Sequence, residues 1–62
     1  MSTVISVTPA AMRPGDTFAP FEGARVISSI ARDMADLCAY VLTFEDGSHF
    51  HAHQRQAYTI GR

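Results

Sequence analysis

Runs rich in β-branched and aromatic residues stand near both ends of this chain, with polar positions interleaved among them. The first run, TVISV at 3–7, is typical of a short strand. Near the end, CAYVLTF at 38–44 and SHFHA at 48–52 flank the polar segment EDG. Two such runs joined by a short loop that contains glycine predict a β-hairpin.

Turn-forming residues fill the stretch between the first strand and the middle of the chain. A Thr-Pro pair directly after the first strand predicts a single helical turn, because threonine caps a helix and proline suits its first position. The sequence RPGD then predicts a turn in which Gly15 adopts a positive φ. We expect TFAPFEG at 17–23 to be a loop in which Phe18 and Phe21 pack under the sheet.

The middle of the chain, residues 24–42, fits two patterns. On a helical wheel its large apolar residues share one side and its charged residues the other, which is typical of an amphipathic helix. The same stretch holds RVISSI and CAYVLTF, which favour two strands joined by the polar segment RDMAD. We predict a mostly β fold, a small and partly open barrel of about 4–5 short strands. The alternative is an α+β fold, βαββ, with a helix near residues 25–38.

Three histidines alternate along the second strand of the hairpin, at His49, His51 and His53. A three-residue loop with Gly47 in the left-handed conformation gives the register that best separates apolar from polar positions. In that register Phe50 faces the core and the histidines face outward. The outward face then collects small or polar residues from the first hairpin strand: Ala39, Val41 and Thr43.

The histidine row is compatible with several kinds of chemistry. Histidines two positions apart on a strand can converge on one metal ion, with a further ligand from Glu45, an N-terminal residue or a second subunit. Neighbouring imidazoles also change charge near neutral pH, so the row could act as a protonation switch. With Arg55 the row is the densest cationic cluster of the chain, which suits a phosphate group or an acidic partner surface. An ordinary solvated strand face is the simplest interpretation.

Length and composition limit the architecture to one domain over residues 1–62. The net charge is −1, whereas a nucleic-acid binder normally carries a clear basic excess. Cys38 is the single cysteine, and its apolar neighbours predict a small core residue. Because the sequence shows no signal-peptide pattern and no apolar run of ~18 residues, we expect a cytoplasmic protein and no membrane partner.

Few other residues suggest chemistry. Asp33 and Asp36 resemble a carboxylate pair, but charges in a polar connection are usually solvated. Ser48 and His49 do not suit a catalytic dyad, because consecutive strand residues point to opposite faces. The sequence has no phosphate-binding loop, dinucleotide fingerprint or zinc-finger spacing. We therefore predict no enzymatic activity and no cofactor.

The order of the turns carries a family resemblance. A first strand, the segment MRPGDTF, further strands, the segment LTFEDGS and a closing AYTI follow one another over most of the chain. This order resembles small SH3-like β-barrel proteins of unknown function from actinobacteria and their phages. The resemblance implies a partly closed β-barrel and no activity. The helical pattern around Met34 departs from it.

These observations predict a small non-enzymatic binding or interaction module with a protein partner. The resemblance implies a phage or mobile-element accessory protein that engages a host protein in the host cytoplasm. A thin core and an open sheet edge also favour self-association into a homo-oligomer. The expected partner-binding face comprises six residues: His49, His51, His53, Arg55, Val41 and Thr43.

Two alternative functions stay open. One is a metal-binding or metal-assembled oligomer built on His49, His51 and His53. The other is a nucleotide or nucleic-acid binder in which arginines act together with stacking aromatic residues. The aromatic candidates are Tyr40, Phe50 and Tyr58.

Overall fold

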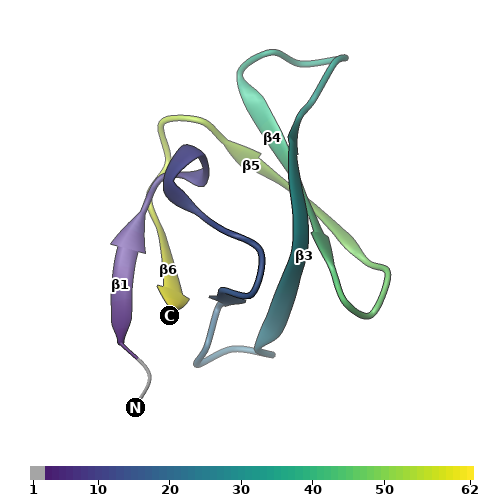
Figure 1. The fold of residues 1–62 in the computed structure, drawn as a ribbon. Helices are drawn as coiled ribbons and strands as arrows, with labels where there is room; N and C mark the ends of the chain where they lie inside the picture. Colours follow the sequence, from purple (N-terminus) through teal and green to yellow (C-terminus); the bar gives the residue numbers. More distant parts are fainter. Residues whose placement is uncertain (1–2) are drawn as a thin grey trace.

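The computed structural model describes residues 3–62, which form six β-strands and one short 3-10 helix. The strands are β1 (Val4–Val7), β2 (Thr17–Phe18), β3 (Arg25–Arg32), β4 (Ala39–Phe44), β5 (His49–His53) and β6 (Tyr58–Gly61), and the helix is η1 (Pro9–Ala11). Neighbouring strands pair antiparallel in the order β1-β6-β2-β3-β4-β5 (Figure 1). The mostly β fold class is confirmed, and the sheet is open between β1 and β5.

The alternative fold, with a helix near residues 25–38, is wrong. Arg25–Arg32 is a strand that pairs with β4 along most of its length, and residues 33–38 form an irregular connection. The strand count is also higher than expected, because Thr17 and Phe18 do not lie in a loop. They form β2, which pairs with both β3 and β6.

The sheet curls because β3 belongs to both of its halves. The first residues of β3 pair with β2 and the later ones with β4, and the register shifts between Ile27 and Ser29. As a result, β1 and β6 lie together on one side of the molecule, apart from the β4–β5 hairpin (Figure 1). The curl encloses a core with residues from five strands and from the end of η1: Met12, Phe18, Ile27, Leu42, Phe44, Ala52 and Ile60.

The expected turns and hairpin register are confirmed. Gly15 and Gly47 have φ angles of +97° and +89°, a region that strains any residue with a Cβ atom. Leu42 lies opposite Phe50, as the three-residue loop requires. The single helical turn after the first strand is also present, although the Thr8 side chain makes no capping hydrogen bond.

A buried aspartate ties the β1–β2 connection to the end of the chain. Asp16 is 4% exposed and accepts hydrogen bonds from Arg62 Nε at 3.1 Å, from Arg62 Nη2 at 2.9 Å and from the Arg13 backbone N–H at 2.9 Å. The Arg62 hydrogen bond lowers the pKa of Asp16 below its ordinary value, although burial acts in the opposite direction. This cluster fixes the loop that leads into β2.

Two burial expectations are wrong. Phe21 is 79% exposed instead of packing under the sheet, and Cys38 is exposed instead of belonging to the core. Both residues lie in connections, where the two-residue alternation of a strand does not determine the side-chain direction. Among residues 3–62, no helix has the length and apolar character needed to cross a membrane.

Candidate functional site

The histidine row lies on the outward face of β5, as the register predicts. His49, His51 and His53 are exposed, whereas Ala52 between two of them is fully buried. The structure also places Thr43 directly opposite His49, and Val41 opposite His51. The six residues of the expected face therefore lie on or beside one strand pair, with exposed Arg55 two residues after its end.

Each imidazole of the row is oriented by a different neighbour. His49 Nδ1 lies 3.1 Å from Thr43 Oγ1, and His51 Nδ1 lies 3.1 Å from Asp33 Oδ2. His53 Nδ1 accepts a hydrogen bond from the Arg55 backbone N–H at 3.1 Å. Within residues 3–62 no three His, Cys, Asp or Glu side chains converge on a point that could hold a metal ion. Metal binding by the row stays a prediction.

The two aspartates of the β3–β4 connection act separately. The Asp33 carboxylate accepts the Ala35 N–H at 2.9 Å and contacts His51, and these two hydrogen bonds lower the pKa of Asp33. Asp36 accepts the Cys38 N–H at 3.0 Å. Each aspartate thus closes a local turn of the connection, and neither contact suggests acid–base chemistry.

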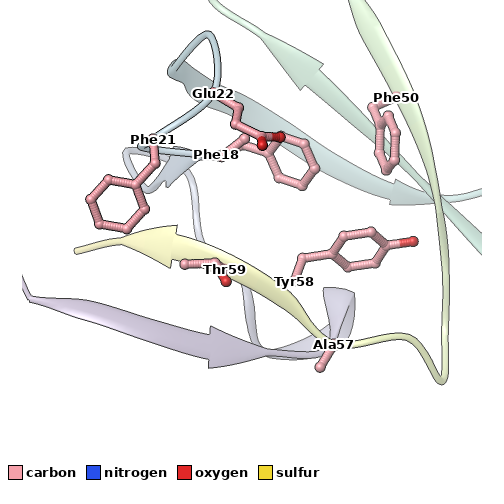
Figure 2. A pocket seen from close by; sticks show the side chains of 8 residues that line it. Phe18, Phe21, Glu22, Phe50, Ala57, Tyr58 and Thr59 are labelled. Atoms are coloured by element: carbon pink, nitrogen blue, oxygen red, sulfur yellow. The ribbon is translucent and has the colours of Figure 1, made fainter.

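A groove with a volume of about 470 Å³ opens on the other face of β5. Figure 2 shows Phe50 among the side chains that line it. A volume of this size lies within the ordinary range of ligand-binding pockets. The groove collects residues from β2, β5, β6 and the two connections beside them. Its lining residues are Phe18, Ala19, Phe21, Glu22, Phe50, Ala57, Tyr58 and Thr59.

Three aromatic rings form one end of the groove. The Phe18 ring centroid lies 5.0 Å from that of Phe50 and 5.7 Å from that of Tyr58, and the Phe50 and Tyr58 rings meet edge to face at 5.6 Å. These are contact distances for aromatic pairs, so a ligand would lie on the rings and not between them. In Figure 2 the Phe21 ring stands apart from these three, at the other end of the groove.

The rim that carries Phe21 contains a strained residue. Ala19 has a φ of +49°, and it is the one non-glycine residue with positive φ within residues 3–62. Its backbone is held on both sides, since the Ala19 N–H donates to the Thr59 carbonyl at 3.2 Å and the Ala19 carbonyl accepts from the Glu22 N–H at 2.9 Å. This tight turn lets the chain bury Phe18 and then expose Phe21 three residues later.

The charge of the groove does not favour a phosphate group. Glu22 is the one charged residue in the lining, and no arginine lines the groove. Arg25 and Arg32 instead lie over the rings of Phe44 and Tyr40, at 4.6 and 4.9 Å from the ring centroids. Tyr40, one of the three stacking candidates for a nucleotide site, therefore packs against Arg32 and does not line the groove.

The sequence predicts only part of the groove. Phe50 and Tyr58 are stacking candidates from the sequence and come together in the structure. No sequence pattern links Phe18, Phe21 or Glu22 to them. Two phenylalanines on either side of Pro20, Phe18 and Phe21, were the available signal.

Comparisons of this chain with protein-family models, with curated proteins and with solved structures find no match.

Proposed function

We propose that this chain is a small SH3-like β-barrel module that binds a partner protein through the aromatic groove and carries out no catalysis. One observation carries the proposal. Phe21 is 79% exposed at the rim of the groove, and the turn that places it there holds Ala19 in the left-handed region.

Neither feature benefits the stability of the chain alone. A left-handed alanine costs about 1–2 kcal/mol, and an exposed phenylalanine forgoes about 1.5–3 kcal/mol of burial. A chain of 62 residues has a thin core, so these are large fractions of its stability. Strained residues and exposed aromatic groups cluster where proteins bind ligands, and aromatic residues dominate the binding energy of interfaces. Partner binding accounts for both features together.

The resemblance in the order of turns supports the SH3-like description, as does a curled antiparallel sheet in which β3 is shared by both halves. The proposal that a phage or mobile element encodes the chain, and that the partner is a host protein, rests on the resemblance alone. The histidine row, with Arg55, is proposed as a second contact face. It lies on the opposite face of the strand that contributes Phe50 to the groove.

The test is a selection of random ten-residue peptides displayed on a surface, with the purified chain as bait. Affinities of the enriched peptides are then measured by fluorescence anisotropy for the wild type and for two variants, Phe21→Ser and Met34→Ser. Met34 is the matched control, because it is an exposed apolar residue, 86% exposed, that does not line the groove.

We expect Phe21→Ser to weaken binding by about 10-fold or more and Met34→Ser to leave it unchanged. Circular dichroism must show that both variants keep the wild-type fold. If no peptide is enriched, or if the two variants bind equally well, the groove is not the binding surface and the proposal fails.

A further inference from the structure

The open edge of β5 presents unpaired backbone groups. β5 is the last strand of the sheet, so one edge has no neighbouring strand within residues 3–62. The Phe44 N–H donates to the Ser48 carbonyl at 2.9 Å, and the Gln54 N–H donates to the Cys38 carbonyl at 2.8 Å. Hydrogen-bonded and non-hydrogen-bonded residue pairs alternate along an antiparallel strand pair. Phe50 lies an even number of residues from both Ser48 and Gln54, so its backbone groups also bond to β4. The backbone groups of the three histidines therefore point to the open edge.

Tyr58 links this edge to the groove. Its hydroxyl accepts a hydrogen bond from the His53 backbone N–H at 3.2 Å, which agrees with the outward direction of that group. The same tyrosine ring lines the groove beside Phe50. The chain itself thus satisfies the edge N–H at His53, and the outward groups of His49 and His51 are left for another strand.

We propose that the partner segment binds as an added β-strand along this edge of β5. The inference rests on the proposed function and adds the conformation of the segment and its side-chain pattern. Residues opposite one another on neighbouring strands share a face of the sheet, so the residue opposite Phe50 points into the groove. An apolar side chain suits that position, because it packs on the rings of Phe50 and Tyr58.

The charge of the histidine face indicates which residues the partner segment carries on either side of its apolar residue. The segment's residues opposite His49 and His51 lie on the histidine face. Exposed Arg55 follows two residues after the end of β5, and its backbone N–H donates to His53 Nδ1. One carboxylate of the chain, Asp33, already contacts that face through His51. Acidic residues at the alternate positions can accept hydrogen bonds from the imidazole N–H groups and complement the charge of the guanidinium group. The occupant is therefore an extended partner segment in which an apolar residue is flanked by acidic ones.

The other edge of the sheet gives an internal control. The backbones of Thr3 and Arg62 exchange hydrogen bonds of 2.8 and 2.7 Å, so Val4 and Ser6 are the β1 residues that point outward. Both edges thus offer the backbone groups of two residues. No residue of β1 lines the groove, however, so an added strand there would gain no aromatic contact.

The first test needs no protein variant. The tightest ten-residue peptide from the selection is synthesised as a series in which each backbone amide in turn is N-methylated, and the affinity of each member for the wild type is measured. Methylation of an amide that pairs with β5 should weaken binding about 10-fold or more, and methylation of the next amide should not. The expected result is an alternation with a period of two.

The second test locates the edge. His51→Pro removes one outward N–H of β5 and leaves the β4–β5 ladder intact, while His51→Ala removes the same side chain and keeps the N–H. We expect His51→Pro to bind at least about 10-fold more weakly than His51→Ala, and Ser6→Pro on β1 to bind like the wild type. If His51→Pro fails to fold, the methylation series alone decides.

The outcomes separate this inference from the proposed function. A peptide that binds without period-two alternation, or that loses affinity with Ser6→Pro and not with His51→Pro, overturns strand addition but leaves the groove as a binding site. A dimer by analytical ultracentrifugation that His51→Pro dissociates overturns the partner segment as occupant, because a second copy then covers the edge. A selection that yields no peptide overturns the proposed function itself.

Discussion

Two connections between strands are each held by an aspartate, but the two aspartates have different partners. In the β1–β2 connection the Asp16 side chain is 5% exposed and pairs with Arg62, whose side chain is 34% exposed. In the β3–β4 connection the Asp33 side chain is 15% exposed and pairs with His51, whose side chain is 67% exposed. An arginine is always charged, whereas an imidazole is charged only when it is protonated.

This difference indicates which part of the molecule is fixed and which can move. The buried pair joins the loop before β2 to the last residue of the chain, and so locks the part of the sheet that contains β1 and β6. The β3–β4 connection is held by exposed contacts, and its apolar residues Met34 and Leu37 are 86% and 61% exposed. We expect residues 33–38 to open before the rest of the fold, because few buried contacts hold them.

Replacement of Asp16 by asparagine should have the largest effect. Asp16 Oδ1 accepts from Arg62, and Oδ2 accepts from both Arg62 and the Arg13 backbone. An asparagine has the same shape, but its NH₂ group would meet an N–H donor in either orientation. We expect a loss of about 1–3 kcal/mol in the free energy of unfolding, and a fall of about 5–20 °C in Tm by circular dichroism. Glu45→Gln, a change at an exposed carboxylate, is the control.

Acid should remove the contribution of Asp16 in the wild type. The Arg62 hydrogen bond lowers the pKa of folded Asp16 below its ordinary value of 3.8. The unfolded chain therefore takes up the proton first as pH falls, and the stabilisation, complete above the unfolded pKa, is lost as pH falls through the folded pKa. We expect urea unfolding to show a steeper loss of stability below about pH 4 in the wild type than in Asp16→Asn. Parallel pH curves would contradict a stabilising role for the charge of Asp16.

Most of the fold follows from local sequence rules. The exceptions are residues whose burial those rules do not predict. Gly47 and the alternation around Phe50 fix the hairpin register, because a shift of one residue would turn every side chain to the wrong face. The helical pattern over 25–38 arises because Met34 and Leu37 complete an apolar stripe, although both are exposed in the structure. Hydrophobicity alone does not show which residues a chain this short can bury.

The candidate site depends on contacts that the sequence does not encode locally. Phe18 meets Phe50 because the sheet curls, although β3 and β4 lie between their strands in the sheet order. The position of Phe21 depends on a left-handed conformation of Ala19, which no turn rule predicts for an alanine. The histidine row was predictable from alternation alone, and it lies where the register places it.

Arg62→Lys should lower Tm by an intermediate amount. This variant tests whether the β1–β2 connection needs the donor geometry of the guanidinium group or only its positive charge. The guanidinium group donates to both oxygens of Asp16 and also to the Ala11 carbonyl at 2.9 Å. A lysine keeps the positive charge but cannot reproduce this fork of donors. We expect a fall in Tm smaller than that of Asp16→Asn and larger than that of Glu45→Gln. A Tm equal to that of the wild type would mean that the positive charge alone is enough to hold the β1–β2 connection.

Asp33→Asn, the same change made in the second connection, should have the smallest effect. The asparagine oxygen can still accept the Ala35 N–H, and its NH₂ group can donate to His51 Nδ1 when that nitrogen carries no proton. Only the attraction to a protonated imidazole is lost, and exposed ion pairs of this kind add little to stability. Thermal unfolding at pH 7 should show a smaller fall in Tm than either variant of the Asp16–Arg62 pair.

If Asp33→Asn destabilised the chain as much as Asp16→Asn, the contacts of Asp33 would stabilise the β3–β4 connection as much as those of Asp16 stabilise the β1–β2 connection. Hydrogen exchange at residues 33–38 would then be as slow as in the strands, and the contrast between the two connections would be wrong.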